Sequence, residues 1–543
     1  MFIEPVFGER FFGREEVLGT LQKRVTALKG GYRQNLALTG PMLAGKSSIL
    51  RHFLKNINDP KVIPLYIEMG EDDFPVFCTR FMATLLYRYL ISESHNGEGD
   101  FEALKNACRE KMPETVNCID IICGDLEQKK EDAAYEKLLA LTSVFKIETG
   151  KNCIVILDEF HNLSNFRLKR PFHTFGKYIM IQKNTMYIVS SSQETLLREI
   201  LSKKLALLFG NFEVIEINGF DNETAMSFIS EKIGNDDMDE NIRNYMIQLS
   251  QGSPFYIEVL SSRFLKRKEE NPQKDPAECL LDAFSDVLYE SNGMLNQYFT
   301  NNINFFMEKK ARKKFITILV SLASGNSTVN AIHDDFGKID KNLGPELQKL
   351  QNLDLIYNSG VFYKISDKLF EYWLKYVYAL RMRSMIDDMD IRYLEFKQSI
   401  ADDFRQYCEF CKKPVIEAVC GLFGKFRNEK IKINMNFRKM PPFDSVQDRS
   451  LSKNLFEITG RIKDKKWVCH LKQEDMVDEQ DVMRLLGLKS GEGSEKIVRK
   501  ILIPLKDIEQ NAFLLAKEHN VWIWDIQQLN RIFRLYEKFE LVL

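Results

Sequence analysis

The chain has 543 residues, a formal net charge of −1, and 44% hydrophobic against 28% charged residues, which is typical of a globular protein. Its length predicts three or four domains, and its near-zero net charge excludes a global basic field that would hold it on nucleic acid or membrane. Charges in the N-terminal stretch MFIEPVFGERFFGREE argue against a signal peptide, and without an apolar run of about 18 residues we expect a cytoplasmic protein with no membrane partner.

A phosphate-binding loop follows the first predicted strand. Residues 35–39 (NLALT) predict the strand, residues 40–47 (GPMLAGKS) match G-x-x-x-x-G-K-[ST] without a mismatch, and a helix follows. The glycines let backbone N–H groups turn toward phosphate, and the helix adds its positive end. Lys46 is placed for the β- and γ-phosphates, and the Ser47 hydroxyl for Mg²⁺. The predicted cofactor-binding residues of the loop are Gly40, Pro41, Leu43, Ala44, Gly45, Lys46, Ser47 and Ser48.

An acidic pair ends a later strand. Residues 153–157 (CIVIL) are wholly apolar, which predicts a strand buried on both faces of a parallel sheet, hence an α/β fold. Asp158 at its tip is predicted to join Ser47 as a Mg²⁺ ligand, and Glu159 to polarise the attacking water, with Lys46 as a further catalytic residue. The alternative is that Glu159 is a solvated loop acid.

The next strand, residues 185–192 (TMYIVSSS), ends in hydroxyl groups. Its tip is expected beside the acidic pair. A hydroxyl there can hydrogen-bond the γ-phosphate or the attacking water, and we predict Ser191 in that role over Ser192. The alternative is that these serines only form a turn.

The order of these motifs resembles the archaeal-type ATPases, which belong to the signal-transduction NTPases and are relatives of AAA+ and origin-recognition ATPases. Residues 11–21 (FFGREEVLGTL) resemble the family's F-x-G-R-E-x-E-L segment, and residues 249–260 (LSQGSPFYIEVL) resemble its G-x-P motif. The resemblance covers residues 1–300 and extends more loosely to the end. It implies ATP and Mg²⁺ as cofactors, and it implies that the nucleotide base is approached by Phe12, Gly13, Arg14 and Pro254.

One position departs from the family. Many relatives carry Tyr-Gly-Arg before the next strand, and that arginine is a candidate transition-state charge; here Asn211 occupies its place. The nearby Arg198, Lys203 and Lys204 do not match it. Because such an arginine contributes about 10³–10⁵ in rate to phosphoryl transfer, we expect slow turnover, or an arginine supplied by another subunit.

A helical lid and a winged helix are expected next. Apolar spacing from residue 221 onward is helical. Residues 309–378 then predict three helices and a β-hairpin with its turn at residues 358–360. The family resemblance agrees with a winged helix here, which binds DNA or only connects proteins. The candidate recognition helix, GPELQKLQNL from Gly344, is only thinly basic, so both roles stay open.

The last segment, from about residue 390, resembles the restriction-endonuclease-like domain that many archaeal-type ATPases carry at their C-terminus. Its pattern predicts short strands with helices between them, at residues 430–437, 453–460, 466–472, 500–505 and 520–526.

In such nucleases an acid on one strand and Glu-x-Lys on the next hold the metal. Here the second motif is His470-Leu471-Lys472, and the acid aligns with Thr459, two residues from Glu457. One carboxylate and a histidine suit Mg²⁺ poorly, because this ion prefers oxygen ligands. We predict that the two strands pair, bringing Glu457 and His470 near the lysine, and that the domain cleaves no nucleic acid. An α/β interaction domain without chemistry is the alternative.

The sequence therefore predicts a P-loop parallel-sheet ATPase core at residues 1–220, a helical lid at 221–300, a winged helix at 301–385 and a restriction-endonuclease-like domain at 386–543. The expected function is an ATP-hydrolysing switch that couples nucleotide state to DNA, a protein partner or a second copy of the chain. Alternatives are an active ATP-dependent nuclease in defence or DNA processing, and a nucleotide-dependent scaffold with negligible turnover. The preference for ATP over GTP stays open.

Overall fold

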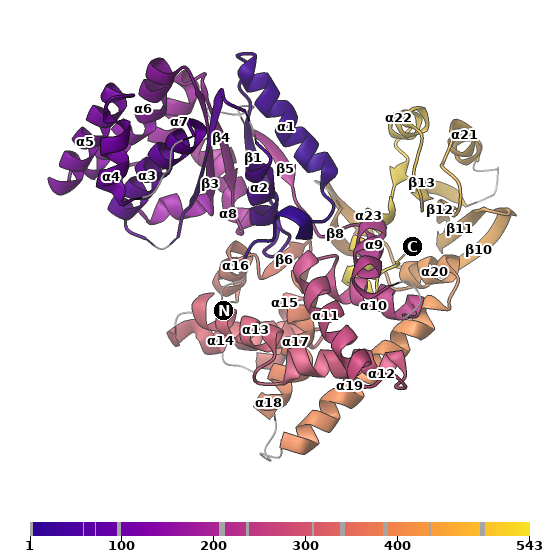
Figure 1. Ribbon diagram of the computed structural model, residues 1–543. Helices are drawn as coiled ribbons and strands as arrows, with labels where there is room; N and C mark the ends of the chain where they lie inside the picture. Colours follow the sequence, from indigo (N-terminus) through magenta and orange to yellow (C-terminus); the bar gives the residue numbers. More distant parts are fainter. Residues whose placement is uncertain are drawn as a thin grey trace. The chain divides into compact units, whose positions relative to one another are not determined.

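The computed structural model (Figure 1) describes residues 4–542 except 58, 71, 95–98, 206–211, 235–237, 307–308, 337–342, 384–388, 434–435 and 489–494. The chain forms two structural units. The first comprises the chain up to Phe220 together with Ser253–Phe255 and Asn352–Asp354, and the second comprises the remainder.

The first unit is built around a β-sheet. Its strands in the described residues are β1 (Asn35–Thr39), β2 (Val62–Glu68), β3 (Asn152–Asp158), β4 (Thr185–Ser190) and β5 (Phe212–Glu216). Its longer helices are α1 (Glu15–Lys29), α2 (Lys46–Lys55), α3 (Phe74–Ser92), α4 (Phe101–Arg109), α5 (Pro113–Glu127), α6 (Glu131–Thr149), α7 (Pro171–Ile181) and α8 (Glu194–Glu199). Short 3₁₀ or π-helical segments are η1 (Gly8–Arg10), η2 (Phe160–Asn165) and η3 (Ile200–Lys204).

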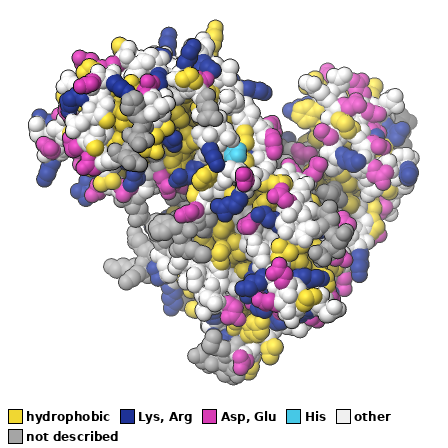
Figure 2. All heavy atoms as spheres, viewed as in Figure 1, with side chains coloured by type: hydrophobic (Ala, Val, Ile, Leu, Met, Phe, Trp, Pro, Cys, Tyr) yellow, Lys and Arg dark blue, Asp and Glu magenta, His cyan; other side chains and the backbone are white. Residues whose placement is uncertain are grey.

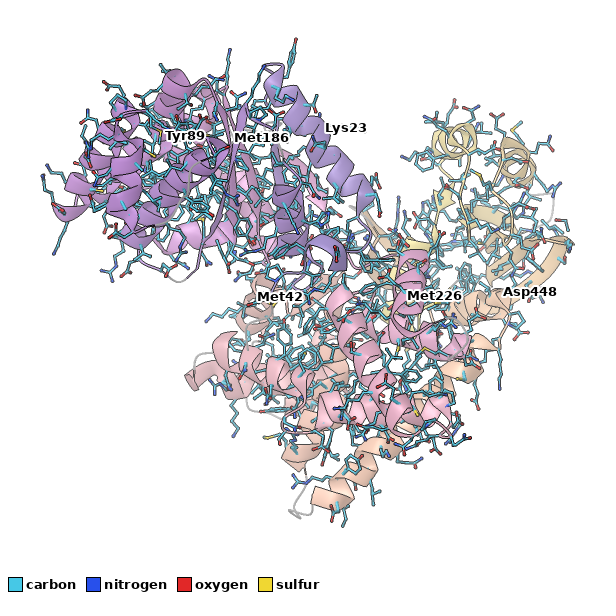
Figure 3. The ribbon with its side chains drawn as sticks, viewed as in Figure 1. Lys23, Met42, Tyr89, Met186, Met226 and Asp448 are labelled. Carbon is cyan, nitrogen blue, oxygen red and sulfur yellow. The ribbon has the colours of Figure 1, made fainter. Side chains whose placement is uncertain are left out.

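The strand order β2-β3-β4-β1-β5 is parallel throughout. Side chains alternate between the two faces, as the two-residue period of a strand requires. From β4, Met186 packs with α1 and α2, whereas Tyr187 packs with α3, α6 and α7. Figure 3 labels Met186 in the sheet and Tyr89 on the α3 side. Both faces are thus covered by helices, and the predicted α/β fold with a parallel sheet is confirmed.

This strand order decides where the polar ends meet. Strand β4 lies between β1 and β3, so the loop after β1 and the residues that end β3 and β4 share one edge of the sheet. In parallel sheets the carboxyl ends of the strands form the ligand-binding edge.

The second unit begins with helices. These are α9 (Asn222–Ile233), α10 (Glu240–Ser250), α11 (Pro254–Glu270), α12 (Pro276–Phe284), η5 (Ser285–Tyr289), α13 (Met294–Phe306), α14 (Lys309–Ala323), α15 (Val329–Phe336), α16 (Gly344–Asn352), α17 (Lys368–Trp373), η7 (Leu374–Tyr378), α18 (Ala379–Arg383) and α19 (Met389–Cys411), with a hairpin of β6 (Ile356–Ser359) and β7 (Phe362–Ile365) between α16 and α17.

The three helices α14–α16 followed by the β6–β7 hairpin reproduce the predicted order of elements. The hairpin turn differs from the prediction, because Ser359 pairs with Phe362 and leaves Gly360 and Val361 as the turn. Gly360 has φ +68°, and a Cβ there would lie 1.7 Å from the carbonyl oxygen of Lys430. Only glycine fits this close approach.

The C-terminal part holds a second sheet. Its elements, with the neighbouring β8–β9 hairpin, are α20 (Val415–Gly424), β8 (Glu429–Ile433), β9 (Asn436–Met440), β10 (Ser445–Ser452), β11 (Leu455–Ile462), β12 (Lys465–Lys472), α21 (Glu479–Gly487), β13 (Lys496–Pro504), α22 (Gln510–Glu518), β14 (Trp522–Ile523) and α23 (Ile526–Tyr536). The sheet order is β10-β11-β12-β13-β14, antiparallel from β10 to β12 and parallel from β12 to β14. Helices α20 and α23 pack on one face, and α21 and α22 on the other.

For this part, one predicted strand is wrong and one strand was not predicted. Residues 430–437 were predicted as one strand but contribute to two, because β8 and β9 form an antiparallel hairpin. Strand β10 was not predicted, since its sequence SVQDRSLS is polar and mostly exposed. An edge strand needs no apolar alternation when its backbone pairs with a neighbour.

The surface carries mixed charge. Figure 2 shows acidic and basic side chains interspersed over the face in view, in keeping with the net charge of −1. Across the described residues, no helix has the length and apolarity needed to cross a bilayer.

Candidate functional site

The loop between β1 and α2 has the backbone of a phosphate cradle. Gly40, Leu43 and Gly45 all have positive φ angles, of 150°, 65° and 92°. A Cβ on Gly40 would lie 2.0 Å from the carbonyl oxygen of Ile217, so this position accepts only glycine. The loop is therefore held in a turn that leaves α2 beginning at Lys46.

Lys46 is buried, with 6% of its surface exposed. Its Nζ donates to the carbonyl oxygens of Gly40 at 2.8 Å and Pro41 at 2.7 Å. Burial lowers the pKa of Lys46, and the charges of Glu159 and Asp158 oppose that shift. The ammonium is thus positioned inside the loop by neutral acceptors, which a phosphate oxygen can replace.

The Ser47 hydroxyl donates to Asp158 Oδ2 at 2.7 Å. The same carboxylate oxygen accepts from the Tyr66 hydroxyl at 2.6 Å, and Oδ1 accepts from the Ser190 hydroxyl. Asp158 is only 2% exposed. The two predicted Mg²⁺ ligands, Ser47 and Asp158, are thus adjacent, although they lie far apart in the sequence.

Glu159 adopts a left-handed backbone conformation with φ 54°. Its Oε2 accepts from the backbone N–H of Ser192 at 2.9 Å and from that residue's hydroxyl at 2.8 Å. Burial, reinforced by the charge of Asp158, raises the pKa of Glu159, whereas the Ser192 hydrogen bonds lower it. The carboxyl group is therefore a half-buried, hydrogen-bonded acid rather than a freely solvated one.

Ser191 contacts a histidine instead of either acid. Its hydroxyl lies 2.9 Å from His161 Nδ1, and that nitrogen lies 3.3 Å from Glu159 Oε2. Burial lowers the pKa of His161 to about 4, so the ring is neutral near pH 7. Ser190 thus hydrogen-bonds Asp158, Ser192 hydrogen-bonds Glu159, and Ser191 contacts His161. A catalytic role for Ser191 stays a prediction.

The N-terminal segment reaches the phosphate loop. Arg14 donates to the carbonyl oxygens of Ala44 at 3.2 Å and Asn218 at 2.5 Å. Its guanidinium lies 4.7 Å from the Phe220 ring centroid, and the Phe12 ring meets the same ring edge-on at 5.9 Å. Gly13, with φ 64°, makes the turn that brings these side chains together.

Two other segments of the first unit also lie at this site. The Ser253 hydroxyl, next to Pro254, donates to the Leu43 carbonyl oxygen at 3.2 Å. Asp354 accepts from the Thr195 backbone N–H at 3.2 Å. Of the remaining predicted residues, Ser48 accepts from the Val6 N–H at 3.0 Å, which fastens the N-terminus to α2.

Sequence reasoning missed several residues of the site. Tyr66, His161 and Asp354 carry no motif, and the pattern of β2 marks Tyr66 only as one residue of an apolar strand. Ser190 and Ser192 were signalled by the hydroxyl run that ends β4. Asn211, the departure from the family, lies outside the described residues. The nearby Arg198 pairs with Glu194 and Glu216.

A second polar cluster lies in the C-terminal sheet. Glu457 on β11 pairs with His470 on β12, as predicted, and His470 Nε2 lies 3.5 Å from Glu457 Oε2. Arg449 Nη2 lies 2.8 Å from Glu457 Oε1, and Lys472 Nζ lies 2.5 Å from Asp481 Oδ2. Among the described residues, no group of three or more His, Cys, Asp or Glu side chains is arranged to hold a metal ion. Burial lowers the pKa of His470.

Comparisons with known proteins agree with the nucleotide site. The family model described as AAA ATPase domain matches residues 10–170. The chain is 23% identical over 254 residues to an uncharacterised ATP-binding protein of Pyrococcus abyssi (strain GE5 / Orsay), a match that covers 46% of this chain and 70% of that protein. The AAA match contains both the phosphate loop and the Asp158–Glu159 pair, and so supports a P-loop nucleotide site of the AAA type.

Solved structures similar to this chain include a Walker-type ATPase of Pyrococcus abyssi, with TM-score 0.49 and 18% identity, covering 68% of this chain and 97% of that one. They also include the ORC2 protein of Aeropyrum pernix in ADPNP and ADP complexes, with TM-score 0.41 and 10% identity, covering 70% and 98%.

Proposed function

We propose that this protein binds ATP with Mg²⁺ and hydrolyses it slowly as a molecular switch. One observation carries the proposal: Ser47 of the phosphate loop and Asp158 of β3 are joined by a 2.7 Å hydrogen bond, with Lys46 and Glu159 directly adjacent in the chain. A loop for phosphate, ligands for a metal and a candidate base thus share one edge of the sheet.

The donor set fits Mg²⁺, which prefers oxygen ligands and keeps several waters when bound beside phosphates. Ser47 and Asp158 would hold it, and both are oxygen donors already within hydrogen-bond distance of each other. Bound there, Mg²⁺ would neutralise charge on the phosphates. Tyr66 and Ser190 hold the Asp158 carboxylate in place.

The remaining residues bind and orient the nucleotide. Lys46 exchanges its carbonyl acceptors for phosphate oxygens, gaining stronger charge-assisted hydrogen bonds. Phe12, Gly13, Arg14 and Pro254 are assigned to the base side of the site, as the resemblance to archaeal-type ATPases implies. The contacts of Arg14 with Ala44 and of Ser253 with Leu43 support this assignment.

Glu159 is assigned as the general base for the attacking water. Its raised pKa makes it a better proton acceptor than an exposed glutamate, provided that it is ionised at the working pH. Ser192 holds its carboxylate through two hydrogen bonds.

We infer that the switch acts through the segments around Ser253 and Asp354. Both belong to the first unit and make hydrogen bonds within it, and from each the chain continues into the second unit, in the predicted lid and winged helix. Nucleotide binding at the phosphate loop would alter these contacts and so control engagement of a partner. The partner classes proposed are DNA through the winged helix, a protein, or a second copy of this chain.

The test is phosphate release by the purified full chain with ATP and Mg²⁺, compared with EDTA, in the presence and absence of plasmid. We expect slow, Mg²⁺-dependent hydrolysis that leaves the plasmid intact. Failure to bind ATP would refute the proposal. Binding without measurable turnover would favour the scaffold alternative, and plasmid cleavage that is lost in Lys472→Ala would favour the nuclease.

A further inference from the structure

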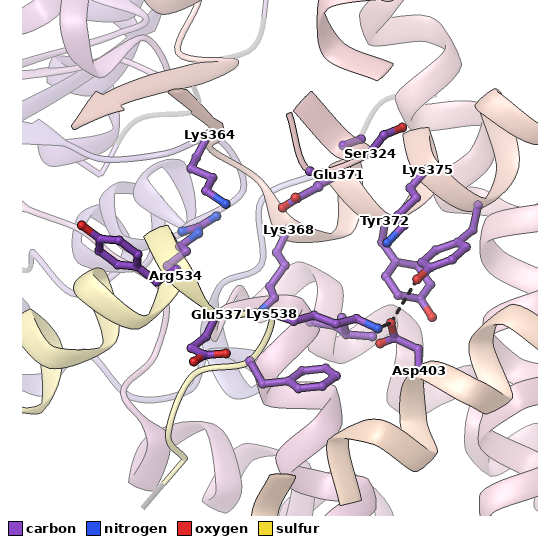
Figure 4. Close-up of a pocket in the computed structure, with 16 residues that line it drawn as sticks. Ser324, Lys364, Lys368, Glu371, Tyr372, Lys375, Asp403, Arg534, Glu537 and Lys538 are labelled. Carbon is purple, nitrogen blue, oxygen red and sulfur yellow. Dashed lines mark hydrogen bonds and ion pairs between the residues drawn. The ribbon is translucent and has the colours of Figure 1, made fainter. Parts of the chain in front are cut away.

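The second unit contains a cavity of about 320 Å³, at the lower end of the size range of small-molecule sites. Its walls come from distant parts of the chain: α10, the end of α14, β7, α17 and η7, the helix α19, and the C-terminal residues from Arg534 to Phe539. Figure 4 shows these side chains extending into one space. The charged lining is predominantly basic, and its cations are Lys364, Lys368, Lys375, Arg534 and Lys538.

Some of these charges are neutralised within the protein. Lys538 Nζ lies 2.5 Å from Asp403 Oδ1, and Asp403 also accepts from the Tyr376 hydroxyl at 3.1 Å. Lys368 pairs with Glu540 at 3.4 Å. The acid Glu537, which lines the cavity, is occupied by Lys425 at 2.6 Å.

Three cations are not neutralised in this way. Among the described residues, Lys364, Lys375 and Arg534 form no ion pair, and one lining carboxylate, Glu371, remains to face them. The Lys364 and Arg534 side chains extend toward each other in Figure 4. Burial lowers the pKa of Lys364; the charge of Glu371 opposes this shift, and the charges of Arg534 and Lys368 add to it. Like charges gathered in a partly buried space are unfavourable unless an anion joins them.

Another part of the wall is aromatic. Tyr372, Tyr376 and Phe539 line the cavity beside the cations. Aromatic faces and cationic groups together suit a molecule that carries both an anionic group and a flat ring. The Arg534 guanidinium is held in position, because its Nη2 donates to the carbonyl oxygens of Ile365 and Ser366 at 3.2 and 2.8 Å.

We propose that this cavity binds a small phosphate-bearing organic molecule of about nucleoside monophosphate size, with Lys364, Lys375 and Arg534 on the phosphate. This is a second ligand site, built from residues that the phosphate loop does not use, and it is independent of the proposed ATPase function.

The test is equilibrium dialysis of radiolabelled AMP with the full chain carrying Lys46→Ala, so that binding at the phosphate loop is weakened. We expect saturable binding that inorganic phosphate displaces. Lys364→Gln and Lys375→Gln should each weaken it about tenfold, the size expected of one charge-assisted hydrogen bond. The control Lys506→Ala, an exposed lysine outside the cavity, should bind as the parent does.

Lys375→Glu separates loss of binding from misfolding, because this side chain is exposed and its replacement should not disturb the fold. The charge reversal should abolish binding, whereas the circular dichroism spectrum should be unchanged. Absence of saturable AMP and phosphate binding would overturn the proposal. AMP binding that persists in both glutamine variants would also overturn it. So would a cavity that binds polyglutamate and not AMP.

Discussion

Lys472 Nζ lies 2.5 Å from Asp481 Oδ2, an acid on α21 that is 6% exposed and belongs to the capping box of that helix. The lysine that corresponds to the nuclease motif is thus engaged in a structural ion pair. It stabilises the junction of β12 and α21 rather than facing a metal site.

Lys472→Ala should lower the free energy of unfolding by about 3 kcal/mol, because it leaves a buried carboxylate without its partner. Urea denaturation measures this change. Lys465→Ala, at an exposed position of the same strand, should change it by less than about 0.5 kcal/mol. ATP hydrolysis at 25 °C should be unaffected by either substitution, and an unfolding free energy equal to wild type in Lys472→Ala would show that the pair is not structural.

Lys46→Ala should weaken ATP binding roughly ten- to hundredfold, since it removes the one ammonium placed inside the phosphate loop. Calorimetry with a slowly hydrolysed ATP analogue measures the affinity. Lys55→Ala, an exposed lysine at the end of the same helix, is the matched control. Equal affinity in Lys46→Ala and wild type would mean that this loop does not bind the phosphates.

Glu159→Gln should retain ATP binding and reduce hydrolysis by about 10²–10⁴-fold, because the amide keeps the shape of the side chain but cannot accept the proton of water. Phosphate release under single-turnover conditions measures this step. The exposed Glu199→Gln serves as control. A Glu159→Gln variant that hydrolyses ATP at the wild-type rate would assign the base to another residue.

The pH dependence of hydrolysis should report the environment of Glu159. The base must be ionised, so activity is lost as the pH falls through its pKa, which burial and Asp158 raise above the usual 4.5. Ser192→Ala removes a hydrogen bond that favours the charged form, so the acid limb should move to higher pH. In Ser192→Ala, the hydrolysis rate at high pH should therefore differ less from wild type than the rate at low pH. A profile of kcat against pH measures the position of the acid limb. An acid limb that is the same in Ser192→Ala and wild type would show that Ser192 does not influence the pKa of the base.

Three glycines offer a graded test of the loop geometry. Gly40→Ala should abolish ATP binding and destabilise the first unit, because its Cβ would overlap the Ile217 carbonyl. Gly45→Ala meets no atom within 4 Å but has φ +92°, so it should cost about 1–2 kcal/mol in strain. Gly19→Ala, in open space within α1, should stabilise the protein by about 1 kcal/mol. Thermal unfolding ranks the three variants, and any other order would contradict the loop geometry.

The sequence alone predicted the parts of this protein that depend on local pattern. The phosphate loop, the buried β3 strand ending in Asp158 and Glu159, and the parallel α/β sheet follow from residue types at short spacing. The pairing of β11 with β12, which brings Glu457 to His470, was also predicted, from the resemblance of this segment to restriction-endonuclease-like domains.

The tertiary structure decided what lies around those parts. Tyr66 reaches Asp158 across 92 residues, and Ser190 reaches it across 32; neither contact leaves a periodic trace in the chain. The same holds for Asp481 beside Lys472 and for the cations gathered in the second unit. Strand β10 was missed because backbone pairing to β11, rather than its own side chains, makes it a strand. Local patterns record burial and backbone preference, whereas a site is completed by side chains that only the packing of distant elements brings together.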